Sequence, residues 1–355
     1  MAAYTTIDNP ELYFQAKTYS GNGSADHAIT LDGDEDMQPD FVWQKRRNDT
    51  NYHVLYDSVR GATKYVYSNT NGAENTNANG LTAFGSNGFT LGNDGDANHS
   101  SGTHVAWCWK GGTTSGIAGS ADITPNAYSF NQTSGFSIVT YNGTDVNGNT
   151  VLHGLGAVPQ VIFVKRRVDS GYDWVVYHKN DVAGLYLNTD GNNNDSSNTN
   201  IWFNGNTPTS TQFHIGTDGR IGDNVSTGAF VAYCFAPKQG YSKFGSYEGN
   251  GNADGTFVYL GFRPAWLMVK PIDASDNWVN FDNKRLGFNS SVSPYSLHAN
   301  KNFAETTDTG QLDFLSNGFK IRSSGNTVNR TSTFIYMAFA EQPFVNSNEV
   351  PANAR

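Results

Sequence analysis

Charged residues are scarce in this chain of 355 residues, at 15%, and no apolar run is long enough to cross a bilayer. A membrane-spanning helix needs about 20 consecutive apolar residues, so we expect no membrane insertion. Lys and Arg number 23 against 32 Asp and Glu, which gives a formal net charge of −9. A nucleic-acid-binding protein needs a basic face to neutralise phosphates, so we expect no nucleic-acid partner.

Cysteine is nearly absent as well. The two cysteines, Cys108 and Cys234, occupy matching places in two similar stretches, HVAWCWK and FVAYCFA. Matching positions in separate copies favour two buried free thiols over a disulfide, which fits folding in a reducing compartment. The first residues contain no basic segment followed by an apolar stretch, so we expect no secretory signal and synthesis in a cytoplasm.

Aromatic residues and glycine are plentiful by contrast. Aromatics make up 13% of the chain, and 38 residues are glycine. Tyr, Phe, Thr and Val favour strands, while clusters of Asn, Gly, Asp and Ser favour turns. The composition therefore predicts an all-β fold.

One motif occurs three times, as PDFVWQKRR at 39–47, PQVIFVKRR at 159–167 and PAWLMVKPI at 264–272. Each copy continues into a second apolar run, and further on into a Ser-Asn-Gly-Phe-like turn and a final aromatic strand. A period of this length is typical of tandem domains. We predict three antiparallel β-sandwich modules of the jelly-roll or concanavalin type, at 14–111, 136–237 and 241–342. The remaining residues are expected to form an N-terminal arm (1–13), a Gly, Ser and Thr-rich linker (112–135) and a C-terminal tail (343–355), with both ends available for attachment.

The final strands of the first two copies alternate large and small residues, as in Trp107 and Cys108 or Tyr233 and Cys234. Both faces are apolar, so we expect such a strand to be central in its sheet and covered on its second face by the opposite sheet or by a neighbouring module. The predicted core residues are Trp107, Cys108, Tyr233, Cys234 and Phe339. The repeated lysines Lys45, Lys165 and Lys270 are expected to emerge at strand ends and to meet a carboxylate such as Asp57 or Asp282.

Sequence signals of catalysis are missing. The chain has no His pair at zinc spacing, no nucleophile elbow and no phosphate-binding loop followed by a helix. The acidic loops LDGDEDMQPD (31–40) and NDGDAN (93–98) lack the full ligand set of a calcium site and favour turn chemistry. Paired carboxylates from distant strands remain open as an alternative. We expect no catalytic residue, no metal, no cofactor and no enzymatic activity.

Positions that differ between the copies are the better candidates for function, because a common fold does not require them. Such segments follow the hairpins, at 64–72, at 184–195 together with 201–206, and at 289–300, and mix aromatics with Asn, Asp and Ser. Aromatic faces and polar side chains together stack on and hydrogen-bond sugar rings. The candidate glycan-binding residues are Tyr67, Tyr186, Trp202 and Tyr295; the alternative is that they cap the sandwich.

The motifs YFQAKTYSGNGS, QPDFVWQKRR, HVAWCWKGG, HGLGAVPQVIFVKRR, FVAYCFAPKQGYSKFGSYEGNG and SNGFKIRSSGNTVN, in this order, resemble a family of virion proteins from marine bacteriophages. Its members are labelled tail-fibre, lectin-like or structural proteins. The resemblance implies tandem lectin-like β-sandwich modules and carries over no catalytic residue. The third copy departs from the pattern, since Pro271 and Ile272 replace the last two basic residues of the Lys-Arg-Arg run.

The resemblance implies a virion component that is made in the host bacterial cytoplasm and displayed on the particle, as a tail fibre or adhesin that contacts host surface glycans. Its expected partners are other virion proteins and further copies of itself, with a trimer as the usual state of fibres. The alternatives are a capsid or tail decoration protein without receptor binding and, third, a polysaccharide depolymerase.

Overall fold

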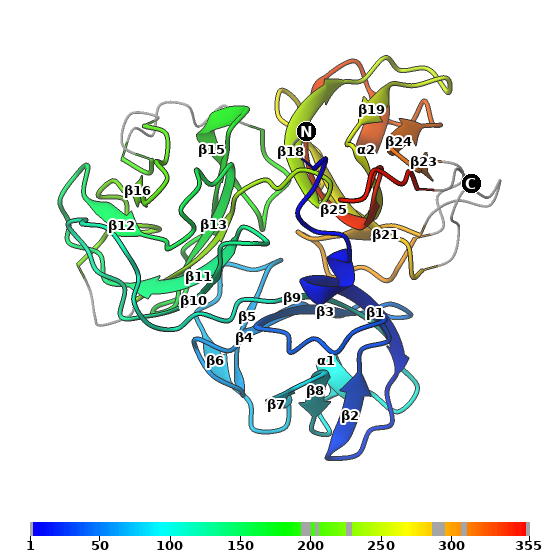
Figure 1. Ribbon diagram of the computed structural model, residues 1–355. Coiled ribbons are helices and arrows are strands. Elements are labelled where there is room, and N and C mark those ends of the chain that lie inside the picture. Colours follow the sequence, from blue (N-terminus) through cyan, green and yellow to red (C-terminus); the bar gives the residue numbers. More distant parts are fainter. Residues whose placement is uncertain are drawn as a thin grey trace.

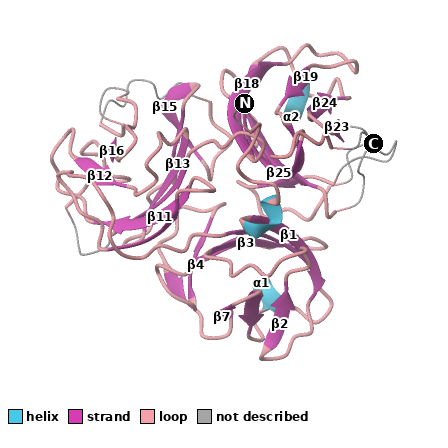
Figure 2. Cartoon of the chain, in the orientation of Figure 1, coloured by secondary structure: helices cyan, strands magenta, loops and turns pink. Residues whose placement is uncertain are grey.

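The computed structural model describes residues 3–192, 200–202, 206–224, 229–285, 295–306 and 311–352. Within these ranges the chain is built from antiparallel sheets (Figure 2). Helical structure there is limited to three single turns, η1 (Pro10–Leu12), α1 (Gly95–Asn98) and α2 (Asn326–Asn329). The all-β prediction is confirmed.

The first copy of the repeat, which we call segment 1 (residues 14–111), contains a large and a small sheet. The large sheet has the order β1-β9-β3-β4-β5-β6. Its strands are β1 (Phe14–Ser20), β3 (Phe41–Arg46), β4 (His53–Asp57), β5 (Lys64–Tyr67), β6 (Asn75–Thr76) and β9 (Thr103–Trp109). The small sheet has the order β2-β8-β7, from β2 (His27–Thr30), β7 (Leu81–Gly85) and β8 (Gly88–Leu91).

Segments 2 (residues 117–237) and 3 (residues 241–343) follow the same plan. The large sheet of segment 2 contains β10 (Ala127–Asn131), β11 (Phe136–Tyr141), β17 (Phe230–Phe235), β13 (Val161–Arg166), β14 (Val175–His178) and β15 (Asp181–Tyr186), in that spatial order. Its small sheet pairs β12 (Thr150–Leu152) with β16 (Gln212–His214). In segment 3 the large sheet runs β18 (Ser242–Glu248), β25 (Thr333–Pro343), β20 (Phe262–Pro271), β21 (Val279–Asp282), β22 (Leu297–His298), and the small one β19 (Phe257–Tyr259), β24 (Gly318–Ile321), β23 (Leu312–Leu315).

The repeated motif takes the same place in each large sheet. It forms β3, β13 and β20, and each of these strands lies between the final strand of its copy and its hairpin partner. The three segments surround a common centre, with segment 2 at the left, segment 3 at the upper right and segment 1 below them in Figure 1.

Residues 112–135 are not a free linker throughout. β10 lies inside this stretch and pairs with β11, so it extends the large sheet of segment 2. Ile123 forms a bridge to Val151, and the carboxylate of Asp122 accepts hydrogen bonds from the amide and hydroxyl of Thr150. The connector therefore becomes part of segment 2 about a dozen residues earlier than the repeat boundaries indicate.

The alternation in the final strands places each face in a different core. On β9 the large residues Val105, Trp107 and Trp109 enter a central core that all three segments share, while Ala106 and Cys108 face the small sheet of segment 1. β17 repeats the arrangement, with Tyr233 in the central core and Cys234 in the core of segment 2, and Phe339 of β25 also enters the central core. All five predicted core residues are buried, and the two cysteines are free thiols in separate cores. The large sheets of the three segments share one core. That the segments are independent modules therefore remains a prediction.

The described residues near the N-terminus pack against the rest of the molecule. Thr5 and Ile7 are each 2% exposed, and Ile7 enters the central core. The Tyr4 hydroxyl donates to the carbonyl of Gly261 in segment 3, and the Asp8 carboxylate accepts from Ser347 of the C-terminal tail. Residues 4–12 are thus a structural part of the assembly, and the expectation of an available N-terminal arm is wrong for them.

Candidate functional site

The four candidate glycan-binding residues lie in different environments. Trp202 is 3% exposed and packs on Tyr177 in the core of segment 2. A buried indole cannot stack on a sugar, so the prediction for Trp202 is wrong, and its role is to fill the core. The rings of Tyr186 and Tyr295 are partly covered by guanidinium groups, from Arg220 at 5.0 Å and from Arg47 at 5.9 Å.

Tyr67 belongs to an accessible group of residues that we call the tyrosine cluster: Tyr52, Tyr65, Tyr67 and Asp96. Tyr52 is 41% exposed, and its ring stacks on that of Tyr67 with 4.4 Å between centroids. Tyr65 packs against the other side of Tyr67 at 5.0 Å. β5 supplies Tyr65 and Tyr67 on one face of the strand, and the residue before β4 supplies Tyr52. Together the three rings form an aromatic surface that extends from the exposed Tyr52 into the sandwich.

A carboxylate completes the tyrosine cluster. The Tyr67 hydroxyl donates to Asp96 Oδ2 over 3.0 Å. Burial raises the pKa of Asp96, and the nearby charge of Asp94 adds to this, while the hydrogen bond from Tyr67 opposes it. Asp94 itself is engaged, because it caps α1 through the amides of Asp96 and Ala97 and accepts from Asn77. The acidic run 93–98 is therefore turn chemistry, as predicted, and Asp96 is the member of this run that faces the tyrosine cluster.

The equivalent positions of the other segments carry different chemistry. Asn98 and Asn329 make the same three kinds of side-chain hydrogen bond, which aligns α1 with α2 and makes Thr327 the counterpart of Asp96. Tyr67 corresponds to Tyr186 and His298, and Tyr52 to Asp173 and Asn277, from the strand registers. The exposed tyrosine stack is thus a property of segment 1 and is not required by the shared fold.

The junctions between segments hold buried ionic networks that the sequence analysis missed. At the junction of segments 1 and 2, Arg60 pairs with Asp57 and with Glu74, and Arg167 of segment 2 binds Glu74 through two 2.9 Å hydrogen bonds. The Tyr233 hydroxyl, also from segment 2, donates to Asp57 Oδ2 over 2.7 Å. Burial alone would raise the pKa of Glu74, but the Arg167 hydrogen bonds and the charge of Arg60 outweigh it and lower this pKa.

The junction of segments 1 and 3 repeats this network with equivalent residues. Arg285 pairs with Asp282 and Glu305, Arg47 of segment 1 binds Glu305, and Trp107 Nε1 donates to Asp282 Oδ2 over 2.9 Å. The sequence signal that could have revealed these two networks is the motif Asp-Xaa-Xaa-Arg, present as DSVR at 57–60 and DNKR at 282–285. Segment 2 has HKND at this place and therefore no such pair.

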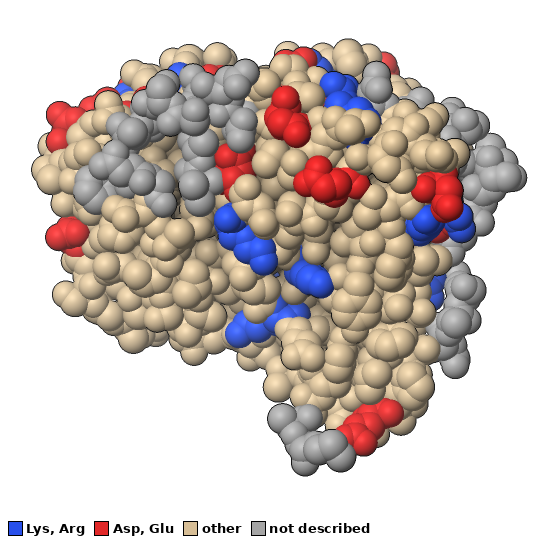
Figure 3. Space-filling model, turned by 90° about the horizontal axis from the view of Figure 1, so that it is seen from above, with Lys and Arg blue, Asp and Glu red and all other residues tan. Residues whose placement is uncertain are grey.

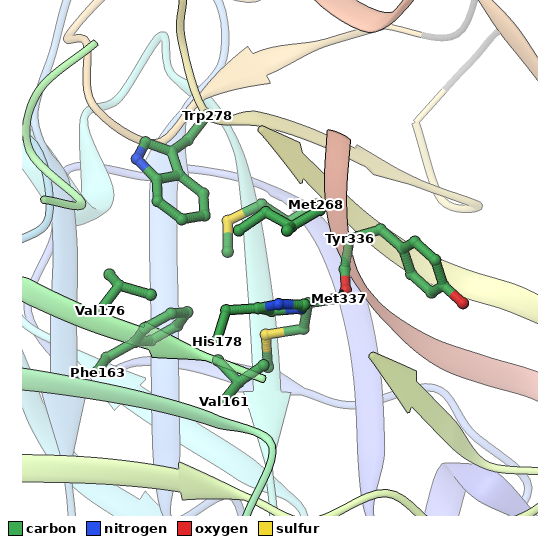
Figure 4. Close-up of a pocket in the computed structure, with 9 residues that line it drawn as sticks. Val161, Phe163, Val176, His178, Met268, Trp278, Tyr336 and Met337 are labelled. Atoms are coloured by element: carbon green, nitrogen blue, oxygen red, sulfur yellow. Dashed lines mark hydrogen bonds between the residues drawn. The ribbon is translucent and has the colours of Figure 1, made fainter. Parts of the chain in front are cut away.

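The junction of segments 2 and 3 differs, because it is apolar and contains a small cavity of about 10 Å³ (Figure 4). The His178 imidazole lies beside Met337 and donates through Nε2 to the carbonyl of Tyr336 over 3.2 Å. Trp278 closes the other side and donates from Nε1 to the carbonyl of Tyr186. A cavity of this size and lining has room for about one water molecule, so it is a packing defect and not a ligand pocket.

The repeated lysines are structural. Lys45, Lys165 and Lys270 are fully buried and donate to backbone carbonyls. The acceptors of Lys45 and Lys270 are the last residues of their own strands, Arg46 and Pro271, and Lys165 donates to Tyr172 over 2.7 Å. Burial lowers the pKa of each to about 8. The expected partners Asp57 and Asp282 are taken by Arg60 and Arg285, so that expectation is wrong.

The described part of the chain contains no cluster of three or more His, Cys, Asp or Glu suited to a metal ion. No helix among the described residues is both long and apolar enough to span a bilayer. The surface is largely uncharged on the face shown in Figure 3, where several Lys and Arg side chains lie near the middle.

Comparison with known proteins gives one family. No curated protein and no solved structure matches the chain. The family model described as domain of unknown function (DUF7483) matches residues 9–343, a range that includes η1 and all three segments. The chain therefore belongs to the DUF7483 family.

Proposed function

We propose that this protein is a structural component of a bacteriophage virion that is displayed on the particle and contacts host surface glycans through the tyrosine cluster. The observation that carries the proposal is the exposed Tyr52 ring, stacked on Tyr67 next to the Asp96 carboxylate. Aromatic faces bind the apolar face of a sugar ring, and carboxylates accept its hydroxyl hydrogens. The phage assignment rests on the sequence resemblance alone.

The rest of the molecule suits a scaffold that presents such a site. The carbonyl of Tyr67 accepts a 2.8 Å hydrogen bond from Nε1 of Trp174 in segment 2, and the amide of Asn51, next to Tyr52, donates to the carbonyl of Asn302 in segment 3. The tyrosine cluster is therefore tied to both neighbouring segments. A fixed aromatic surface loses little conformational entropy on binding, and weak single sites gain strength when many copies are displayed on one particle.

A glycan array with the protein displayed multivalently tests the proposal. We expect retention of a subset of bacterial envelope glycans and a loss of about tenfold in affinity, equivalent to about 1.4 kcal/mol, in Tyr52→Asn. Asn is the residue of segment 3 at this position, Asn277, so the variant is expected to fold. Tyr128→Phe, a change in segment 2, serves as the control.

Two outcomes would reject the proposed site. Silence across the array, with normal incorporation into particles, would favour a decoration protein without receptor binding. Glycan binding that Tyr52→Asn leaves unchanged would move the contact elsewhere on the chain. Release of reducing ends from envelope polysaccharide during the same assay would favour the depolymerase instead.

A further inference from the structure

The small sheet of segment 3 presents two aromatic rings to solvent. Phe257 and Tyr259 are 44% and 47% exposed, while Val258 between them is buried in the core of segment 3. Alternate residues of a strand share a face, with about 7 Å between their Cα atoms. β19 is an edge strand, paired only with β24 among the described strands. We call the surface made by these two rings the β19 face.

Gly318 keeps the neighbouring position of the β19 face bare. It pairs with Tyr259, and a Cβ added to it would lie 2.0 Å from the carbonyl oxygen of Val258. No side chain fits there, so none covers the Tyr259 ring from β24. Phe257, by contrast, lies opposite Lys320 of β24, so Tyr259 is the ring of this pair that is accessible to a flat ligand from the side of β24.

Tyr259 is also held in place. The Tyr4 hydroxyl lies 3.2 Å from the Tyr259 hydroxyl, and Lys243 Nζ donates to the Tyr259 carbonyl over 2.6 Å. The same ammonium lies 5.3 Å from the centre of the Tyr259 ring. A ring fixed by both contacts needs little ordering when a ligand stacks on it.

Positive charge lies beside the β19 face. The Lys243 ammonium lies 5.3 Å from the centre of the Tyr259 ring. Burial lowers the pKa of Lys243, and the charge of Lys179 in segment 2 lowers it further. No described carboxylate forms an ion pair with Lys243, so an anion placed on the Tyr259 ring would be attracted by this ammonium group.

The shared fold does not require these residues. The strand registers align Phe257 with Ala28, Tyr259 with Thr30 and Lys243 with Gln15 of segment 1. The position between the two rings is a buried aliphatic residue in both segments, Val258 in segment 3 and Ile29 in segment 1. Segment 1 therefore builds the same sheet without exposed aromatics or a lysine.

We propose that the β19 face binds a negatively charged saccharide, with one sugar ring on Tyr259 and Phe257 and its carboxylate or phosphate at Lys243. Two rings offer far less than the roughly 800 Å² per partner of a stable protein interface, so a second protein is a poor fit. The stacking area and the Lys243 ammonium together match an acidic sugar. This site lies on another segment than the tyrosine cluster and goes beyond the function proposed above.

Calorimetric titration of the full chain with oligogalacturonate, and with the neutral oligogalactose of the same length, tests this inference. We expect the acidic oligosaccharide to bind about tenfold tighter than the neutral one, a difference of about 1.4 kcal/mol. The double variant Phe257→Ala, Tyr259→Thr should lose binding of both ligands. Lys243→Gln should lose the preference for the acidic ligand and keep the neutral one. All three substitutions install the residues of segment 1, so unchanged thermal unfolding is expected.

Equal affinity for the two ligands, no binding of either at millimolar concentration, or full binding by the folded double variant would each overturn the inference. The Tyr52→Asn variant separates it from the proposed function. Acidic saccharide binding that persists in Tyr52→Asn and disappears in the β19 double variant supports this site, whatever happens at the tyrosine cluster.

Discussion

Single hydroxyls and ring nitrogens hold the segments together at their shared core. Tyr233 donates to Asp57 across the junction of segments 1 and 2, at the buried end of the ionic network, where the side chains of Asp57 and Arg60 are closed to water. A hydrogen bond to a buried charged group contributes more to stability than a hydrogen bond between neutral groups, because no water molecule replaces the donor when it is lost. The effect of removing one such donor therefore depends on what it faces, and not on burial alone.

Tyr233→Phe is expected to destabilise the protein by about 1.5–3 kcal/mol, since it removes one donor from the buried Asp57 carboxylate. Tyr241→Phe is the matched control, because the Tyr241 hydroxyl is buried in the same core with no hydrogen-bond partner among the described residues. Its loss should be neutral or stabilising. Denaturant unfolding of both variants measures the difference; equal costs would contradict the donor role of Tyr233.

His178 gives the stability a pH dependence. Its Nδ1 accepts from the amide of Asn180 and its Nε2 donates to Tyr336, so the neutral form is fully used. Burial lowers the pKa of His178 to about 4. In the unfolded chain the pKa is about 6.5, so below that pH the unfolded state binds the proton and the folded state does not. Stability should therefore fall as the pH drops from about 6.5 to about 4, and then level off.

The measurement is the free energy of unfolding at a series of pH values for the native chain and for His178→Gln. The other buried histidines, His53, His104 and His153, also have lowered pKa values and contribute to the same slope. His178→Gln should reduce the slope by about one proton's share, about 1.4 kcal/mol per pH unit at most. An identical slope in both proteins would show that folding leaves the proton occupancy of His178 unchanged, which contradicts a lowered pKa.

At the scale of strands and loops, the sequence predicted the parts that packing dictates. The period-two alternation of Val105, Trp107 and Trp109 indicated a strand buried on both faces, and the structure confirms it. What alternation cannot tell is which face meets another segment, because both faces are apolar. β10 was not predicted, because its partner β11 is a strand that belongs to the repeat. The pairing of β10 with β11 gives no signal in the local sequence pattern. Trp202 was misassigned because its Asn-rich flanks do not report that the ring turns into the core.

Two of the three junctions are reinforced by a Glu between two arginines, and the third is not. Arg167 in segment 2 corresponds to Ile272 in segment 3, which fits the loss of the network between segments 2 and 3. Arg167→Ile is expected to cost about 2–4 kcal/mol, because it leaves the half-buried Glu74 with Arg60 alone. Lys301→Ala is the control. The ion pair of Lys301 with Asp190 crosses the junction of segments 2 and 3 on the exposed surface, and its loss should cost less than about 1 kcal/mol. Similar costs in urea unfolding would mean that the buried network adds nothing over a surface pair.

On the scale of the whole molecule, the large sheets of the three segments and the N-terminal residues form one packed unit. Removal of residues 1–13 would uncover the central core at Ile7 and break the contacts of Tyr4 and Asp8 with segment 3 and the tail. We therefore expect this deletion to lower the unfolding temperature clearly, whatever it does to assembly. A deletion variant with unchanged unfolding temperature would restore the interpretation of residues 4–12 as an attachment arm.

Cooperativity between the segments follows from the shared core. Phe235 of β17 packs on Phe136 of its own segment, on Trp109 of segment 1 and on Phe339 of segment 3. Phe213, by contrast, is buried in the core of segment 2 alone. Truncation of either to Ala should cost about 3–5 kcal/mol, but the cost should be distributed differently.

Hydrogen exchange under native conditions distinguishes the two variants. Phe235→Ala should raise the exchange rates of β9, β17 and β25 together, because these strands line one core and lose its packing together. Phe213→Ala should raise them in β12 and β16 first, and leave β9 and β25 close to native. If Phe235→Ala affected only segment 2, the segments would be independent domains that merely touch, and the tandem-module description would be the better one.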